Sequence, residues 1–341
     1  MPEPLDPVAA LREIAFLMER VLDDPRRVRA FRAASDAIAE LSPAEFERRV
    51  TESSWRELRG IGESTAAVIV QALAGRVPDR LAKLRAEAKP LATGGEDLLA
   101  RLRGDLHTHT DASDGGSPVE RSREVATARG YEYLAITDHS PRLTVANGLS
   151  PERLAAQLDQ LAELNAEDGC RLLSGIEVDI LTDGRLDQVP ELLTRLDVVV
   201  ASVHSELRMD AEPMTHRMVA AVANPFTNVL GHCTGRLITG GRGTRPQSAF
   251  DAEVVFEACR QFDVAVEINS RPERADPPDD LLALARDIGC LFAIDSDAHA
   301  PGQLDFPAYG AARATAAGIP AERVVNTWPL RELLSWSRAH R

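Results

Sequence analysis

Residues 105–115 read DLHTHTDASDG, a stretch in which a short strand-like run at Asp105-Leu106 leads into two histidines. His107 and His109 are two residues apart, so in an extended strand both imidazoles face the same side and can reach one ion. Asp114 follows five residues later and adds a carboxylate. The stretch therefore predicts a metal site where a strand ends.

The same pattern, a short apolar run that ends in polar residues, recurs down the chain to about residue 300. Seven such runs occur: Asp105-Leu106, YLAIT, RLLSGIEV, DVVVASV, TNVLG, VAVEI and CLFAI. Helix-like segments such as PVERSREVATARG, PERLAAQLDQLAELNAEDG, AEVVFEACRQF and DDLLALARDIG separate them. Buried strands that alternate with helices form a parallel sheet, and seven units predict an α/β fold with a closed or nearly closed barrel. Its active face should lie at the carboxyl ends of the strands.

Potential metal ligands concentrate at these strand ends. Six of the eight histidines lie there, which unrelated histidines would not do. His216 and His340 lie elsewhere and are interpreted as ordinary core or surface residues. Nitrogen and oxygen ligands without thiolates suit Zn²⁺, Mn²⁺ or Fe²⁺. The nine candidate ligands are His107, His109, Asp114, His139, Glu177, His204, His232, Asp297 and His299.

Nine ligands are more than one ion needs, so we expect two or three divalent ions to share them. Such sites hydrolyse phosphoesters, because the metals generate a hydroxide from water and neutralise charge on the phosphoryl oxygens. The predicted nucleophile is this metal-bound hydroxide.

The first 89 residues have a different character. Apolar residues recur there at helical spacing, and Gly60 and Gly62 form a predicted turn between two short helices. We expect a small all-helical domain over residues 1–89, a linker over 90–101 and the barrel over 102–341.

Charge and composition restrict the possible partners. Residues 1–90 hold 15 Lys and Arg against 15 Asp and Glu, so the whole net charge of −14 falls on residues 91–341. A domain that coats nucleic acid nonspecifically would be basic, whereas bound divalent cations would offset clustered carboxylates. The four cysteines lack CxxC spacing, and neither a secretion signal nor an apolar run of about 20 residues is found, which predicts a cytoplasmic protein. A phosphorylated substrate is predicted, but no membrane association and no protein partner.

The motifs HTHTDASDG, TDH, GHCTGR and DSDAH, with Glu177 and His204 between them, resemble the successive motifs of the PHP (polymerase and histidinol phosphatase) superfamily. The resemblance implies a distorted (βα)7 barrel with a trinuclear site. By that likeness His107, His109, Glu177 and Asp297 hold the first metal. Glu177 bridges to a second metal held by His204 and His232, and Asp114, His139 and His299 hold the third.

GHCTGR and EINSRPERAD are most similar to the PHP domain of bacterial family X DNA polymerases, with Cys233 where that motif usually has proline. This likeness implies that Arg236 and Arg274 contact the substrate phosphate. AFRAASDAIAEL and LRGIGESTAAVI resemble the helix-hairpin-helix domain of the same polymerases. The backbone N–H groups of Gly60 and Gly62 would then approach a DNA phosphate.

The N-terminal domain departs from its relatives at the positions that carry chemistry. Val68 stands where the lyase members have a Schiff-base lysine, and Glu63 and Ser64 replace phosphate-binding lysines. The nucleotidyltransferase palm is also missing. The sequence therefore predicts neither a lyase nor a polymerase.

Three functions are compatible with these observations. The chain could process DNA ends as a 3′–5′ exonuclease or 3′-phosphatase, with the helical domain presenting DNA. It could instead hydrolyse a small phosphate ester such as histidinol phosphate or a nucleotide, which the acidic barrel favours. The third function is a DNA-binding or scaffold protein with a vestigial metal site, although every expected ligand position is filled.

Overall fold

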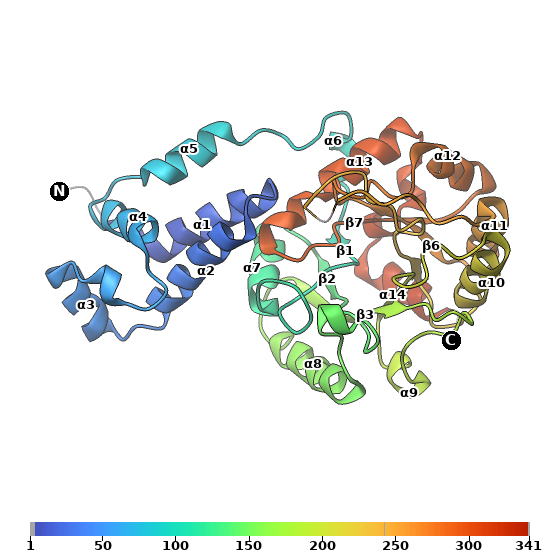
Figure 1. The fold of residues 1–341 in the computed structure, drawn as a ribbon, viewed down its shortest axis with the longest axis horizontal. Helices are drawn as coiled ribbons and strands as arrows, with labels where there is room; N and C mark the ends of the chain where they lie inside the picture. Colours follow the sequence, from blue (N-terminus) through green and yellow to red (C-terminus); the bar gives the residue numbers. More distant parts are fainter. Residues whose placement is uncertain (1–3, 242, 340–341) are drawn as a thin grey trace. The chain divides into compact units, whose positions relative to one another are not determined.

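A computed structural model describes residues 4–241 and 243–339, so His340 lies outside the described residues. The chain divides into two compact units, of which the first ends at Pro90 but also includes Pro301–Gln303. The N-terminal unit is all-helical, and the second, the barrel unit, contains all seven strands (Figure 1).

Aspartate or serine followed by proline begins the first three helices of the N-terminal unit. Asp6, Asp24 and Ser42 accept hydrogen bonds from the first turns of α1 (Pro7–Arg20), α2 (Pro25–Ala39) and α3 (Pro43–Glu52). Proline is favoured at the first helical position, where its missing N–H would have no partner. Apolar residues of α1, α2 and α4 (Glu63–Leu73) share one core with Trp55, and α5 (Asp79–Glu87) adds Leu81 to it.

The predicted turn lies between the 3-10 helix η1 (Trp55–Glu57) and α4. Gly60 has a φ of +91°, a left-handed conformation that glycine adopts without steric penalty. Gly62 is the N-cap residue of α4, and its backbone N–H donates to the Thr65 hydroxyl at 3.0 Å. The two glycines thus form the helical hairpin that the sequence predicted.

The barrel unit is a seven-stranded parallel sheet in which neighbouring strands follow the order of the chain from β1 to β7. Beyond the ends of β1 and β7, Thr108 and Ala298 form a parallel bridge, which nearly closes the barrel. The predicted fold is confirmed. The strands are β1 (Gly104–Asp105), β2 (Tyr133–Ile136), β3 (Arg171–Asp179), β4 (Val198–Ser202), β5 (Val229–Leu230), β6 (Ala265–Asn269) and β7 (Phe292–Asp295).

Helices connect the strands and cover the barrel (Figure 1). The longer predicted segments form helices, and α6 occupies part of the predicted linker, where Leu98 joins the core of the barrel unit. The helices are α6 (Glu96–Leu99), α7 (Val119–Ala128), α8 (Pro151–Leu164), α9 (Pro190–Leu193), α10 (Ala211–Val222), α11 (Ala252–Gln261), α12 (Asp279–Ile288), α13 (Pro307–Ala316) and α14 (Leu330–Arg338).

The last helix, α14, closes the amino-terminal end of the barrel. Leu333 is fully buried in one cluster with Val198, Val229 and Ala265, the first residues of β4, β5 and β6. Asn228, just before β5, donates to the Ser337 carbonyl at 2.8 Å. Apolar side chains fill this end of the barrel. A polar active site is therefore expected at the opposite end, where the strands have their carboxyl ends.

Two smaller expectations concern cysteine and membranes. All four cysteines are buried and none forms a disulfide, which agrees with the lack of a disulfide framework in their spacing. Among the described residues, no helix is long and apolar enough to span a membrane.

Candidate metal centre

The nine candidate ligands converge at the carboxyl ends of the strands. His107 and His109 follow β1, His139 follows β2, and Glu177 lies near the end of the longest strand, β3. The others lie beyond the ends of β4, β5 and β7, except Asp114, which lies on the loop that leads to α7. His216, in contrast, is exposed on α10, as expected.

Glu177 is the centre of the cluster and is almost completely buried. One of its oxygens, Oε2, lies 3.3 Å from His107 Nε2, 3.5 Å from His109 Nε2 and 2.8 Å from His139 Nδ1. The other, Oε1, lies 3.3 Å from His204 Nε2 and 2.8 Å from His232 Nε2. A single carboxylate therefore contacts five imidazoles, with its two oxygens facing different groups.

A second group surrounds Asp114. Its Oδ1 lies 3.4 Å from both His139 Nε2 and His299 Nε2. His139 thus faces Glu177 with one ring nitrogen and Asp114 with the other. Asp297 lies between the two groups, because its Oδ1 is 3.4 Å from His109 Nε2 and 3.5 Å from His299 Nδ1.

These separations fit shared metal ions. Two ligand atoms about 2.1 Å from one tetrahedral ion lie roughly 3.4 Å apart. Six of the nitrogen–oxygen pairs measure 3.3–3.5 Å. Ligand atoms lie within 4.8 Å of one another in three sets: His109, Asp114, His139 and His299; His107, His109 and Glu177; and His139, Glu177 and His204.

Unpartnered ring nitrogens support the same interpretation. Nε2 of His107 and both ring nitrogens of His109 are buried without a hydrogen-bond partner among the described residues. A buried polar atom without a partner is destabilising, by about 1–3 kcal/mol, unless something else satisfies it. Cations at these positions would satisfy the nitrogens and the carboxylates together.

The electrostatics of the cluster also favour cations. Burial alone would raise the pKa of Glu177, but His107, His204 and His139 outweigh it and hold that pKa well below its usual range. Burial, with His299 and His139 nearby, lowers the pKa of His109 to about 3. The central carboxylate is therefore charged and the His109 imidazole is neutral, the forms that bind metal. Against the effect of burial, Glu177 raises the pKa of His139 to about 10 and also raises that of His204, so metal ions bound there would displace protons.

A second layer of carboxylates orients the histidines. Glu267, fully buried in β6, lies 2.5 Å from His107 Nδ1 and accepts the backbone N–H of His232, also at 2.5 Å. Asp179, two residues after Glu177, bonds to His204 Nδ1. The sequence analysis missed both carboxylates. The signal was available for Asp179, because residues i and i+2 of a strand share a face.

The comparisons with known proteins agree with this geometry. Residues 4–78 match the helix-hairpin-helix domain, and residues 105–271 match the PHP domain. The DNA polymerase/3′-5′ exonuclease PolX of Bacillus subtilis is 36% identical over 236 residues, which are 69% of this chain and 41% of that protein. A probable phosphatase of Caldanaerobacter subterraneus is 30% identical over 213 residues, which are 58% of this chain and 77% of the relative. The chain belongs to the PHP family.

Among the solved structures to which the chain is similar is the histidinol phosphate phosphatase of Lactococcus lactis complexed with zinc, L-histidinol and phosphate. It has a TM-score of 0.46 and 19% identity, over 64% of this chain and 94% of that one. The present chain spans about two fifths of the Bacillus PolX protein. As a PHP family member with this cluster of ligands, it is a metal-dependent phosphoesterase.

Three arginines lie near the ligands of this PHP centre, of which the sequence analysis had named Arg236 and Arg274. The Arg274 Nε lies 3.3 Å from Asp297 Oδ2, while its Nη1 is buried without a hydrogen-bond partner among the described residues. Arg236 donates to the carbonyls of Arg274 and Ala275, so it supports the turn that carries Arg274. Arg271, the one missed, donates to the Asp297 carbonyl at 2.9 Å.

Proposed function

We propose that this chain hydrolyses phosphoester bonds at DNA 3′ ends, as a 3′–5′ exonuclease or a 3′-phosphatase. The observation that carries the proposal is the pairing of a helix-hairpin-helix domain with a PHP domain in one chain. The Bacillus relative, whose name includes a 3′-5′ exonuclease activity, supports the same substrate.

In this proposal two or three divalent ions, zinc, manganese or iron, are held by the nine candidate ligands. Glu177 would bridge two of them, because its two oxygens face different imidazoles. When bound, such ions activate water and neutralise phosphoryl charge. Glu267 and Asp179 would fix the tautomers and orientations of His107 and His204, so that Nε2 of each ring faces the centre.

Arg274 would bind a phosphoryl oxygen. Its unpartnered Nη1 is one donor of a forked guanidinium, a geometry that matches phosphate. Arg236 would act through Arg274, since two of its donors are already used on backbone carbonyls. In our proposal Arg236 is therefore a positioning residue rather than the direct phosphate contact that the resemblance implies.

The N-terminal domain, residues 1–89, would bind the DNA backbone through the hairpin at Gly60 and Gly62. The backbone of Gly62 has open space around it, because a Cβ placed there would meet nothing within 4 Å. A phosphate could therefore approach the N-terminus of α4 closely, which favours anions. Lyase chemistry is not part of the proposal, since Val68 is buried in the N-terminal core.

A second candidate is a small-molecule phosphatase acting on histidinol phosphate or a nucleotide. The specific observation in its favour is charge, because all of the net −14 lies on residues 91–341 and would repel a long polyanion. The similarity to a probable phosphatase also supports it.

Gly62 allows a clean test of the two candidates in the full-length chain. Gly62→Glu adds a carboxylate where a DNA phosphate would bind, and Gly62→Gln adds a neutral side chain of the same size. The backbone there is extended and uncrowded, so both variants should fold. Hydrolysis of a 3′-labelled DNA duplex and of histidinol phosphate is measured for each variant at several salt concentrations.

If the chain processes DNA ends, Gly62→Glu weakens DNA cleavage by about tenfold relative to Gly62→Gln, and wild-type affinity for DNA falls steeply with salt. Hydrolysis of histidinol phosphate alone, with equal rates for both variants, would identify a metabolite phosphatase instead.

A further inference from the structure

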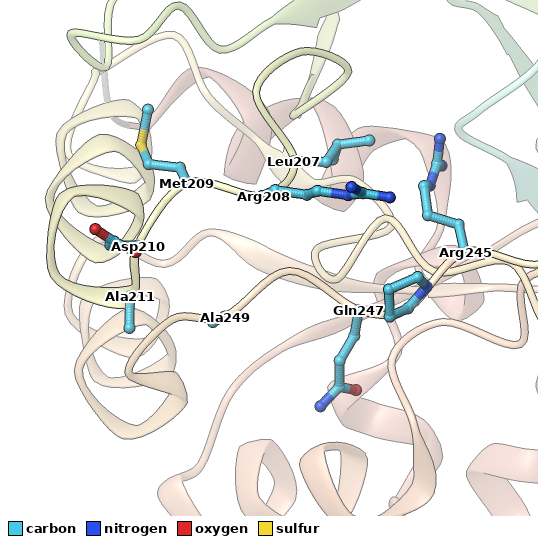
Figure 2. A pocket seen from close by; sticks show the side chains of 9 residues that line it. Leu207, Arg208, Met209, Asp210, Ala211, Arg245, Gln247 and Ala249 are labelled. Atoms are coloured by element: carbon cyan, nitrogen blue, oxygen red, sulfur yellow. The ribbon is translucent and has the colours of Figure 1, made fainter.

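A cavity of about 410 Å³ lies among loops that follow β4 and β5. Its walls come from residues 207–211 and from residues 245–249. In Figure 2 the side chain of Arg208 extends to the right across the view, and that of Arg245 extends upward. None of the proposed metal ligands lines this cavity.

The cavity is nevertheless built on the two loops that carry His204 and His232. Ser248 links them, because its Oγ donates to the Leu207 carbonyl at 2.9 Å and its N–H donates to the Thr234 carbonyl at 2.8 Å. Arg245 Nε donates to the Gly235 carbonyl at 2.7 Å, three residues after His232. A ligand in this cavity would therefore lie beside the segments that position two of the imidazoles around Glu177.

The lining of the cavity is amphipathic. Leu207, Met209 and Pro246 provide apolar surface, and Gln247 offers an amide that can both donate and accept hydrogen bonds. Arg208 is exposed, and among the described residues its guanidinium forms no hydrogen bond or ion pair.

The charge of the lining favours a nucleoside over histidinol. Two arginines against the single carboxylate of Asp210 make the cavity locally positive, within a part of the chain that carries a net −14. Histidinol carries a cationic amine and would be repelled by these arginines. A nucleoside brings no positive charge, and the flat face of a base stacks well on a guanidinium or an apolar side chain.

We propose that this cavity binds the nucleoside of the 3′-terminal nucleotide while its phosphate lies at the metal centre. The Arg208 guanidinium stacks on the face of the base, and Leu207 provides apolar surface beside it. This inference rests on the proposed function and specifies its substrate as a nucleoside phosphodiester.

Two chromogenic diesters with the same leaving group test the proposal in the metal-loaded, full-length enzyme. The p-nitrophenyl ester of thymidine 5′-monophosphate carries a nucleoside, and bis(p-nitrophenyl) phosphate does not. The measured quantity is the ratio of kcat/KM for the nucleoside ester to kcat/KM for the nucleoside-free ester. Arg208→Ala removes the stacking group, Ala249→Phe fills the cavity, and Arg331→Ala, an exposed arginine on α14, is the matched control.

We expect this ratio to fall at least about fivefold in Arg208→Ala and in Ala249→Phe, and to be unaltered in Arg331→Ala. Thymidine 5′-monophosphate should also inhibit the wild-type enzyme more strongly than inorganic phosphate does, and Ala249→Phe should remove that difference. The Tm of each variant is measured as a control, because a Tm close to that of the wild type shows that a lower ratio does not come from misfolding.

Three other outcomes overturn the inference in different ways. A ratio that is the same in all variants, with both esters hydrolysed, refutes the nucleoside site but leaves the phosphodiesterase function intact. Hydrolysis of neither ester, beside removal of phosphate from a 3′-phosphorylated oligonucleotide, refutes the inference but leaves the 3′-phosphatase form of the proposed function. Turnover of histidinol phosphate alone refutes the proposed function, and the nucleoside site falls with it.

Discussion

Glu267→Gln is the substitution that most directly tests how the metal centre is organised. Glu267 contacts two parts of the centre at once, the His107 ring at Nδ1 and the backbone N–H of His232, both at 2.5 Å. Glutamine keeps the shape but removes the charge, and it can accept from only one of these donors through its single carbonyl oxygen. One charge-assisted hydrogen bond, about 1.5–3 kcal/mol, is lost.

That loss corresponds to roughly a 10- to 100-fold reduction in metal affinity or activity, the usual effect of removing a carboxylate that orients a histidine ligand. Metal affinity is measured by competition with a chromophoric chelator, and hydrolysis is measured at saturating metal. Glu257→Gln, on the exposed face of α11, makes the same chemical change away from the centre and should alter neither quantity.

The reasoning is refuted if Glu267→Gln binds metal and hydrolyses substrate as the wild type does. Reduced affinity with a normal rate at saturating metal would still support it, because the orientation of His107 would then affect binding alone. An unfolded variant is recognised by its circular dichroism spectrum before either assay.

Four further outcomes follow from the same structure. Glu177→Ala should abolish hydrolysis, because this one carboxylate contacts five imidazoles. Elemental analysis should show less bound metal, and full activity would contradict the metal assignment. Asp138→Asn should lower the free energy of unfolding by about 1–3 kcal/mol, because Asp138 accepts hydrogen bonds from Thr110 and Ser113. An unchanged denaturant midpoint would contradict this expectation. Removal of bound metal by a chelator should lower Tm, and added Zn²⁺ or Mn²⁺ should restore it in calorimetry, because ions bound only by the folded state stabilise it. Leu333→Ala should reduce stability by about 2–5 kcal/mol without changing metal stoichiometry, because its side chain fills the far end of the barrel.

The barrel and its active face could be predicted because two independent signals coincide. The apolar runs identify the strands, and polar residues such as His139 and His204 follow directly after them. Parallel strands bring their carboxyl ends to one edge, so residues separated by more than 60 positions become neighbours. This proximity follows from the parallel direction of the strands alone and does not require knowledge of side-chain positions.

Other features depend on tertiary structure that the sequence does not encode locally. Glu267 lies within an apolar strand, and only the closure of the barrel brings it to His107. His232 and Asp297 have positive φ values of 21° and 51°, conformations that residues other than glycine adopt mainly where the surrounding structure imposes them. Arg236 could be selected from its motif, but its contacts with two carbonyls required the folded turn at Arg274.

The acidity of the barrel is less of an obstacle to a DNA substrate than the sequence alone indicates. The carboxylates of Glu177, Asp114, Asp297, Glu267 and Asp179 lie in or directly around the metal centre. Two or three divalent ions would bring about four to six positive charges to that place, which would roughly neutralise these five carboxylates where a phosphate binds. The charge that repels a polyanion is then the remaining surface charge, which salt screens over about 8 Å at physiological ionic strength. DNA should therefore bind the metal-free chain far more weakly than the metal-loaded one.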